Sequence, residues 1–259
     1  TATALASTLL SVTPRAAGDS TWVQIAQLYG SDTDAEDAFG ERADIDGGTL
    51  VVGAFSKDFD TGAAYVFERS PEPPTEWVET KKLTPQPGDE IFGEEVYVSG
   101  DTIAVLALHP SGTATYIYGR DVGGEGMWGL AGRIVLPEGG LGDLDGNTLA
   151  YSHSRADFDG QLQVGQVHML ERGPDGPADW HYDQSLRASD GDAQDHFGLR
   201  NALSGDRLLI GVPDEDEFGD DSGAAYVFER DERGEWIEVA KLFQQPQPEE
   251  NDDFGDAID

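Results

Sequence analysis

The chain has 259 residues and carries 51 acidic against 16 basic side chains, for a formal net charge of −35, with no cysteine. So negative a field repels nucleic acid and anionic membranes, because phosphate binding requires basic patches. The missing cysteines exclude disulfides and thiolate chemistry, and no apolar run is long enough to cross a bilayer.

Tryptophan recurs along the chain at intervals of roughly 50 residues, a period typical of propellers and solenoids. The five positions are Trp22, Trp77, Trp128, Trp180 and Trp236. We expect four short strands in each interval, since the segments are rich in β-branched and aromatic residues and are bounded by Gly, Pro, Asp or Ser. In chain order they are a Trp strand, a Phe-Gly strand, an apolar strand after a Gly/Asp turn, and a Tyr-Val-Phe strand.

The first interval shows the pattern. Phe39-Gly40 is followed by the turn at 46–48, the apolar run 49–54 and the run 63–69. Later intervals repeat the two runs at 102–105 and 114–118, at 148–150 and 166–172, and at 207–210 and 224–230. The middle strands are apolar at successive positions, which indicates sheets covered on both faces. Four antiparallel strands per repeat are the blade of a β-propeller.

We therefore expect an all-β fold, a β-propeller of four-stranded antiparallel blades, forming one domain over residues 1–259. The predicted blade units are 22–76, 77–127, 128–179, 180–235, and 236–259 joined to 1–21. In this prediction N-terminal strands complete the fifth blade and remove the exposed edges of an open ring. The alternative is a fragment of a larger, seven-bladed propeller.

Two recurring motifs resemble the FG-GAP repeat family, known from the propeller heads of integrin α-chains. The motifs are the pairs beginning at Phe39, Phe92, Phe197 and Phe254, and the Gly-Ala-Pro-like segments 53–55, 107–110 and 211–213. The resemblance implies a propeller used for adhesion or protein contact outside the cell. Where many family members have a calcium loop, this chain has only tight turns, as at 44–47 and 143–146. The family's calcium sites are therefore not carried over.

Clusters of acidic residues are the candidate functional sites. The residues nearest to an alternating Asp spacing are Asp32, Asp34, Asp37, Asp190, Asp192, Asp195, Asp214, Asp216 and Asp220. Such loops can present oxygens to calcium, which takes about 6–8 of them. The alternative is turn chemistry, because Asp bonds to its own backbone in turns. The overall excess of acid has three explanations: adaptation to high salt, cation binding, or a soluble surface with no specific role.

The sequence shows none of the common catalytic motifs, and the histidines lack metal-ligand spacing. His168 occupies the position held by Tyr65, Tyr116 and Tyr226, which indicates a core or rim substitute. We predict a non-catalytic, secreted or cell-surface binding or scaffold domain. Its rim loops would contact another protein or a cell-surface or matrix component, with calcium as the cofactor the loops would take. The alternative is a glycoside hydrolase with two carboxylates in the central channel.

Overall fold

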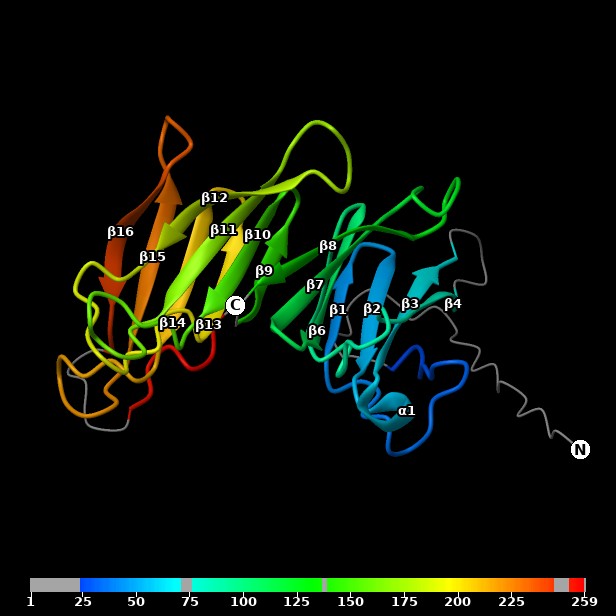
Figure 1. Ribbon diagram of the computed structural model, residues 1–259, viewed down its shortest axis with the longest axis horizontal. Helices are drawn as coiled ribbons and strands as arrows, with labels where there is room; N and C mark the ends of the chain where they lie inside the picture. The colour runs from blue at the N-terminus through cyan, green and yellow to red at the C-terminus, as the bar shows by residue number, and fades with distance from the viewer. Residues whose placement is uncertain (1–23, 71–75, 137–138, 245–251, 259) are drawn as a thin grey trace, which may run out of the picture.

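The fold is all-β apart from one short turn, throughout the part of the chain that the structure describes. The computed structural model describes residues 24–70, 76–136, 139–244 and 252–258. Its strands form four antiparallel sheets of four strands each, paired in chain order within every sheet. Figure 1 shows the sheets following one another, from the blue sheet β1–β4 to the yellow and orange sheet β13–β16. The predicted fold class of four-stranded propeller blades is confirmed.

The strand bounds are as follows. The first sheet holds β1 (Ala43–Asp46), β2 (Thr49–Ala54), β3 (Ala63–Arg69) and β4 (Trp77–Leu83). The second holds β5 (Val96–Ser99), β6 (Thr102–His109), β7 (Gly112–Gly119) and β8 (Gly129–Leu136). The third holds β9 (Gly140–Asp145), β10 (Thr148–His153), β11 (Gln166–Arg172) and β12 (Trp180–Leu186). The fourth holds β13 (Arg200–Ser204), β14 (Arg207–Val212), β15 (Ala224–Arg230) and β16 (Trp236–Leu242).

Each tryptophan strand closes the sheet before it instead of opening the next one. In the pairs β3–β4, β11–β12 and β15–β16, the tryptophan lies opposite the last arginine of the preceding strand. The predicted order of strands in the units 22–76, 77–127, 128–179 and 180–235 is therefore wrong by one strand. The physical reason is that a strand following another through a short connection tends to pair with it directly.

The predicted fifth blade falls only partly on described residues. Its first piece, Trp236–Leu242, is β16 of the fourth sheet, so its assignment to a fifth blade is wrong. Residues 1–21, which the prediction uses to complete that blade, lie outside the described residues. Phe254 forms a parallel bridge with Gly223, as Phe197 does with Gly165 one unit earlier. The number of blades stays a prediction.

The first strand of every sheet lies at the centre of the molecule. β1 lies against β5, β5 against β9, and β9 against β13. A central cavity of about 480 Å³ is lined by residues at these strands, including Asp44, Glu95, Tyr97, Gly142 and Asn201. The sheets are thus arranged around a shared axis, as propeller blades are.

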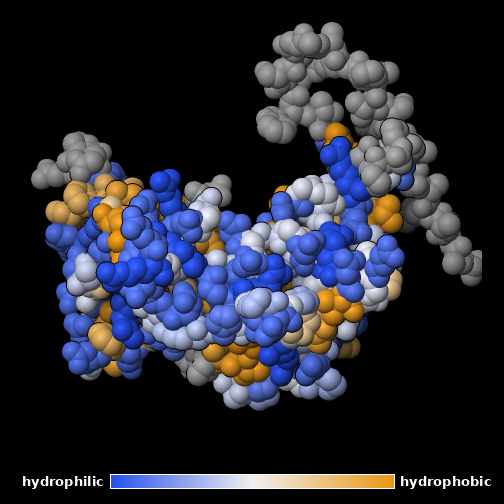
Figure 2. Space-filling view, turned by 90° about the horizontal axis from the view of Figure 1, so that it is seen from above, coloured by the Kyte–Doolittle hydropathy of each residue, from blue (hydrophilic) through white to orange (hydrophobic). Residues whose placement is uncertain are grey.

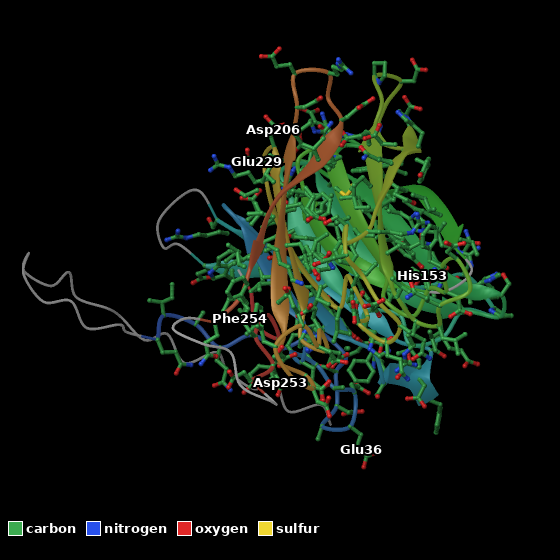
Figure 3. The ribbon with its side chains drawn as sticks, turned by 90° about the vertical axis from the view of Figure 1, so that its left-hand side faces the viewer. Glu36, His153, Asp206, Glu229, Asp253 and Phe254 are labelled. Atoms are coloured by element: carbon green, nitrogen blue, oxygen red, sulfur yellow. The ribbon has the colours of Figure 1, made fainter. Side chains whose placement is uncertain are left out.

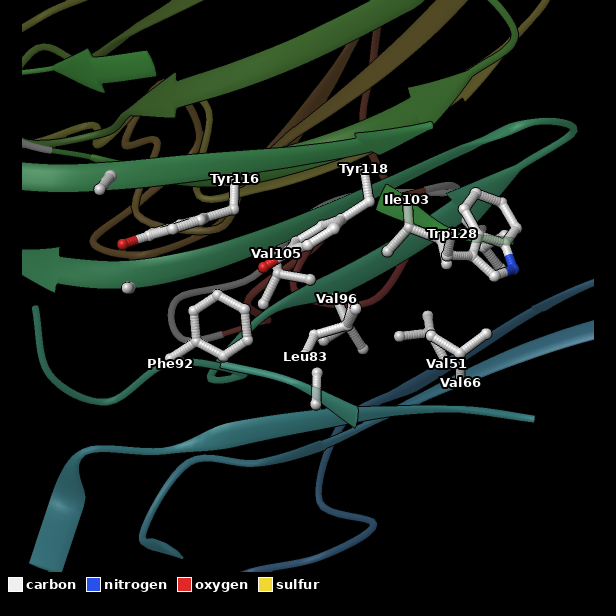
Figure 4. Close-up of a cluster of buried hydrophobic side chains, with 14 residues drawn as sticks. Val51, Val66, Leu83, Phe92, Val96, Ile103, Val105, Tyr116, Tyr118 and Trp128 are labelled. Atoms are coloured by element: carbon white, nitrogen blue, oxygen red, sulfur yellow. The ribbon is translucent and has the colours of Figure 1, made fainter. Parts of the chain in front are cut away.

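Apolar side chains fill the spaces between neighbouring sheets. One cluster joins Val51 and Val66 of the first sheet to Val105 and Tyr116 of the second (Figure 4). Similar clusters lie between the second and third sheets and between the third and fourth. Because both faces are covered, β6 is buried at six consecutive positions, which confirms the interpretation of the consecutive apolar runs.

The recurring tryptophans stack on arginines that tie neighbouring sheets together. The Arg120 guanidinium lies 4.5 Å from the centre of the Trp128 ring and binds Glu68 of the first sheet at 2.5 Å. Arg230 repeats this arrangement with Trp236 and Glu171, whereas Arg172 stacks on Trp180 and donates to the Thr102 hydroxyl of the second sheet. A guanidinium can use its face on an aromatic ring and its edge on a carboxylate at once. The tryptophan period therefore marks contacts between sheets.

Candidate functional site

The acidic loops gather at one end of the sheets, here called the acidic rim (residues 30–38, 55–62, 190–196 and 213–223). In Figure 3, Glu36 and Asp253 lie at this end, and Asp206 and Glu229 lie at the opposite end. The rim is formed where the loop before each Phe-Gly pair meets the loop between the second and third strands of a sheet. Repeated strand geometry therefore brings repeated acids together.

In the first sheet, Asp32 is neutralised by groups of the chain itself. Its carboxylate accepts hydrogen bonds from the Tyr65 hydroxyl at 2.6 Å and from the Lys82 ammonium at 2.7 Å. The bond from Lys82, followed by that from Tyr65, lowers the pKa of Asp32 below its usual value. Tyr65 and Lys82 face each other across the β3–β4 pair, so the strand register sets this geometry.

A buried lysine completes the first-sheet site. Lys57 begins the single turn α1 (Lys57–Asp60) and is only 5% exposed. Its ammonium donates to the Asp32 carbonyl at 2.6 Å and to the Asp37 carboxylate at 3.2 Å. The Asp34 amide also donates to Asp37 at 2.6 Å, and that bond, with Lys57 after it, lowers the pKa of Asp37. Since an unpaired buried carboxylate is costly, Lys57 is the counter-ion that allows Asp37 to be buried.

The fourth sheet repeats the arrangement around Asp190. Its carboxylate accepts hydrogen bonds from the Tyr226 hydroxyl and the Lys241 ammonium, each at 2.8 Å. Lys241 also donates to Glu215 and Glu217, each at 2.7 Å. Tyr226 and Lys241 face each other across β15–β16, in the same register as in the first sheet. Three carboxylates here share one ammonium group.

The second sheet carries an arginine version of the same site. Asp89 accepts a hydrogen bond from the Tyr116 hydroxyl at 2.6 Å and binds Arg133, which lies opposite Tyr116 on β8. In the third sheet, His168 takes the tyrosine position and binds the Ser185 hydroxyl at 2.6 Å. The interpretation of His168 as a substitute for tyrosine is confirmed, and burial lowers its pKa.

The structure brings together only some of the nine predicted calcium ligands. Asp32, Asp34 and Asp37 lie in the first-sheet site, whereas Asp190, Asp192, Asp195 and Asp216 line one cavity of about 380 Å³ in the fourth sheet. Asp214 binds His196 at 2.7 Å, and Asp220 is absent from the lining of that cavity. Among the described residues, no group of three or more His, Asp or Glu side chains is placed to hold a metal ion. Calcium binding by these loops stays a prediction.

The aspartates of the tight inner turns join neighbouring sheets. Asp44 accepts the Val98 amide of β5 at 2.7 Å, and Asp143 accepts the Leu203 amide of β13 at 2.6 Å. The second aspartate of each turn accepts a hydrogen bond from a glycine amide of the neighbouring sheet, Asp46 from Gly100 and Asp145 from Gly205, each at 2.7 Å. Burial raises the pKa of Asp143 to about 6. These turns, where the family resemblance would place calcium loops, bind neighbouring backbone.

Sequence reasoning missed the cations of the acidic rim. Lys57, Lys82 and Lys241 are three of only four lysines in the chain. A signal was present: the segment Ala-Ala-Tyr-Val-Phe-Glu-Arg occurs identically at 63–69 and 224–230, and each copy is followed by a tryptophan strand that ends in Lys-Leu. A scarce residue placed twice after identical strands is a candidate counter-ion.

Comparison with known families agrees with the repeated geometry. The FG-GAP repeat model matches residues 22–67 and 180–228. The chain carries FG-GAP repeats. The two matched FG-GAP stretches contain Asp32 with Tyr65 and Asp190 with Tyr226, so the acid and the hydroxyl of both sites belong to the repeat itself.

Solved structures share the fold at low identity. Sqt1 from Chaetomium thermophilum is 16% identical with a TM-score of 0.52, over 83% of this chain and 52% of that one. A protein from Lactobacillus plantarum is 15% identical with a TM-score of 0.48, over 75% of this chain and 54% of that one. The chain thus spans about half the length of these structures, and the likeness to Sqt1 shows the fold alone. No curated protein matches the sequence. Among the described residues, no helix has the length and apolar character needed to cross a membrane.

Proposed function

We propose that the chain is a non-catalytic binding propeller, secreted or displayed at the cell surface, which contacts another protein or a matrix component through its acidic rim. The observation that supports this is the recurrence of one acid–tyrosine–base arrangement, around Asp32, Asp89 and Asp190, in three sheets. A catalytic site needs a few unequal groups with separated pKa values. Equivalent groups repeated in several sheets suit a binding surface.

The charge of the molecule favours a basic partner. With a formal net charge of −35, the chain attracts cationic surfaces and repels anionic ones. Figure 2 shows hydrophilic residues over most of the face seen from above, with apolar residues in separate patches. Complementary charge speeds association and selects partners more than it raises affinity. We therefore propose contacts that weaken as salt is added.

The glycoside hydrolase alternative has less support. Asp44 lines the central cavity together with Glu95, and its carboxylate is held by the Val98 amide and by the amide of Ile45 at 2.8 Å. Asp143 is held by two backbone amides in the same way. A carboxylate committed to backbone amides is poorly placed to act as an acid or nucleophile toward a sugar.

The test compares partner binding with hydrolysis. Immobilised chain is exposed to a panel of matrix and cell-surface proteins of differing charge, and separately to a panel of polysaccharides. We expect saturable, salt-sensitive binding that is lost in an E36K/D216K double variant of the acidic rim. The charge-matched D206K/E232K variant at the opposite end should keep it. Polysaccharide hydrolysis that disappears in D44N would contradict the proposal.

A further inference from the structure

The sites of the first and fourth sheets are built on equivalent backbone. Ser31 binds Glu79 of β4 through its amide at 2.7 Å and its hydroxyl at 2.8 Å. Ser189 binds Glu238 of β16 through the same two groups, each at 2.8 Å. The two acidic loops therefore leave their sheets at the same point and in the same direction.

The next turn of each loop is also equivalent. The Asp34 amide donates to the Asp37 carboxylate at 2.6 Å, and the Asp192 amide donates to the Asp195 carboxylate at 2.7 Å. Asp37 and Asp195 are both buried, at 8% and 4% exposure. One buried carboxylate thus stands at the same place in both sites.

The charge facing that carboxylate is inverted between the two sheets. The Gly62 amide donates to the Lys57 carbonyl and the Gly223 amide donates to the Glu215 carbonyl, both at 2.9 Å. Glu215 therefore occupies the backbone position of Lys57. In the first sheet an ammonium group meets the buried aspartate, whereas in the fourth sheet a second carboxylate does.

In the described part of the chain, the fourth-sheet site has no counterpart of Lys57, and its one ammonium group, on Lys241, binds Glu215 only through Oε1. Glu215 is only 6% exposed, and its Oε2 is buried with no hydrogen-bond partner among the described residues. Burial, with Glu215 and other acids nearby, raises the pKa of Asp195 to about 6. At the equivalent Asp37 the pKa is lowered instead. A buried carboxylate oxygen without a partner costs free energy, and a bound cation would remove that cost.

Space for a cation is present at this point. A cavity of about 380 Å³, here called the fourth-sheet cavity, is lined by Asp190, Asp192, Asp195, Glu215, Asp216, Glu217 and Lys241. Six carboxyl groups thus face one ammonium group, and Lys241 already binds three of them. The cavity therefore holds more carboxylates than its single ammonium group can neutralise.

We propose that a primary ammonium group, on a lysine side chain of the partner protein, enters the fourth-sheet cavity and takes the place that Lys57 fills in the first sheet. The chain's other lysines, Lys57, Lys81 and Lys82, belong to the first sheet, so this ammonium comes from another molecule. The proposal rests on the proposed binding function and specifies the partner group that the acidic rim selects.

The test uses the whole chain and a short capped peptide with one central lysine, acetyl-Gly-Gly-Lys-Gly-Gly-amide. Binding is followed by chemical-shift changes at the Asp195 and Glu215 amides in low salt. The same peptide with Nε-acetyl-lysine should not bind, since acetylation removes the charge. In E215K the new side chain copies Lys57 and occupies the cavity, so we expect at least a tenfold loss of peptide affinity. The matched variant E125K, with the same charge change at an exposed loop position, should stay within twofold of the parent.

D195N provides a second variant in case E215K does not fold. It keeps the shape of the side chain but removes one charge, and we expect a several-fold loss of peptide affinity.

Saturable lysine binding that is unchanged in E215K or in D195N overturns this inference, as does a peptide that fails to bind the parent chain. Binding of free 1,5-diaminopentane without binding of the peptide overturns a protein partner as the source. Calcium binding in this cavity in place of the peptide overturns the ammonium ligand. If E215K still binds the partners of the parent chain, the proposed function stands and only this inference fails.

Discussion

Lys57 shows how a single side chain decides whether a buried acid is stable. With 6% of its side chain exposed, it lies against Asp37, whose side chain is 11% exposed. Both groups have left water, so the pair depends on good geometry and on the extra bonds to the Asp32 carbonyl and the Asp34 amide. Such a pair stabilises little when intact and costs much when one partner is removed.

Replacing this lysine by an apolar side chain is therefore a sharp test. We expect Lys57→Met to lower the free energy of unfolding by about 3 kcal/mol, because Asp37 is left buried without its counter-ion. Urea unfolding monitored by tryptophan fluorescence measures the change. Lys81→Met, at an exposed position of β4, should change it by less than about 0.5 kcal/mol. Equal effects of the two substitutions would remove the structural role assigned to Lys57.

The protonation of Asp195 makes the stability of the fold depend on pH. Its pKa in the folded chain is about 6 against an ordinary value of 3.8, so the folded state holds the proton more tightly. Its contribution to stability is thus complete below about pH 4 and is lost as the pH rises through about 6. We expect Asp195→Asn to gain up to about 3 kcal/mol of stability at pH 7 relative to the parent chain, and nothing at pH 4. Urea unfolding at both pH values checks this, and an equal gain at both would contradict it.

At the scale of strands, the Phe-Gly pairs act by joining each unit to the sheet before it. Phe92 forms a parallel bridge with Gly62, Phe197 with Gly165, and Phe254 with Gly223. A Cβ on Gly62 would lie 2.3 Å from the Phe92 carbonyl oxygen, and its φ is +83°. Glycine recurs at the positions of Gly62, Gly165 and Gly223 because two backbones approach too closely there for any side chain.

Two substitutions separate the effect of this close approach on stability from the effect of backbone strain. Gly62→Ala should destabilise the chain by more than Gly47→Ala, since Gly47 also has a positive φ of 56° but has no atom within 4 Å of an added Cβ. We expect about 1–2 kcal/mol for the control, from the left-handed conformation alone, and clearly more for Gly62. Thermal unfolding of the two variants makes the comparison. Equal losses would show that strain, not contact with Phe92, requires the glycine.

The inner turns make a second element-scale prediction. Asp44 accepts a hydrogen bond from the Val98 amide, and Asp143 accepts one from the Leu203 amide; each amide belongs to the neighbouring sheet. Asp44→Ala should speed hydrogen exchange at the Val98 amide while leaving the Leu203 amide protected, and should cost about 1–2 kcal/mol. Asp143→Ala should do the reverse. Exchange that rises at both amides in either variant would indicate general loosening and not loss of one bond.

At the scale of the whole molecule, the net charge of −35 opposes folding through self-repulsion, and salt screens it. We expect the melting temperature to rise steadily with NaCl. Any further rise with calcium at matched ionic strength would come from acids that no lysine binds, such as Asp195, because lysine ammonium groups already bind Asp32, Asp37 and Asp190. A larger rise with calcium that a chelator reverses would support the sequence-based calcium prediction.

Much of the architecture could be predicted because it is periodic. Tight turns, consecutive apolar runs and evenly spaced tryptophans indicate four-stranded sheets covered on both faces, and the structure has them. The order of strands within a unit could not be predicted from the period. A repeat has no intrinsic start, so only the pairing of Trp77 with Arg69 shows where one sheet ends.

The sequence by itself determined the class of fold, the recurrence of acidic loops and the equivalence of His168 to the tyrosines, since these follow from repeated local patterns. Only the tertiary structure decided which charges meet. Lys57 and Asp37 are 20 residues apart, and Tyr65 and Asp32 are 33 apart, so their contacts arise from how loops of one sheet fold back on it. Only the matching backbone hydrogen bonds from Gly62 and Gly223 show that Glu215 occupies the position of Lys57. Electrostatic energy depends on distances in space, and spacing along the chain does not give them.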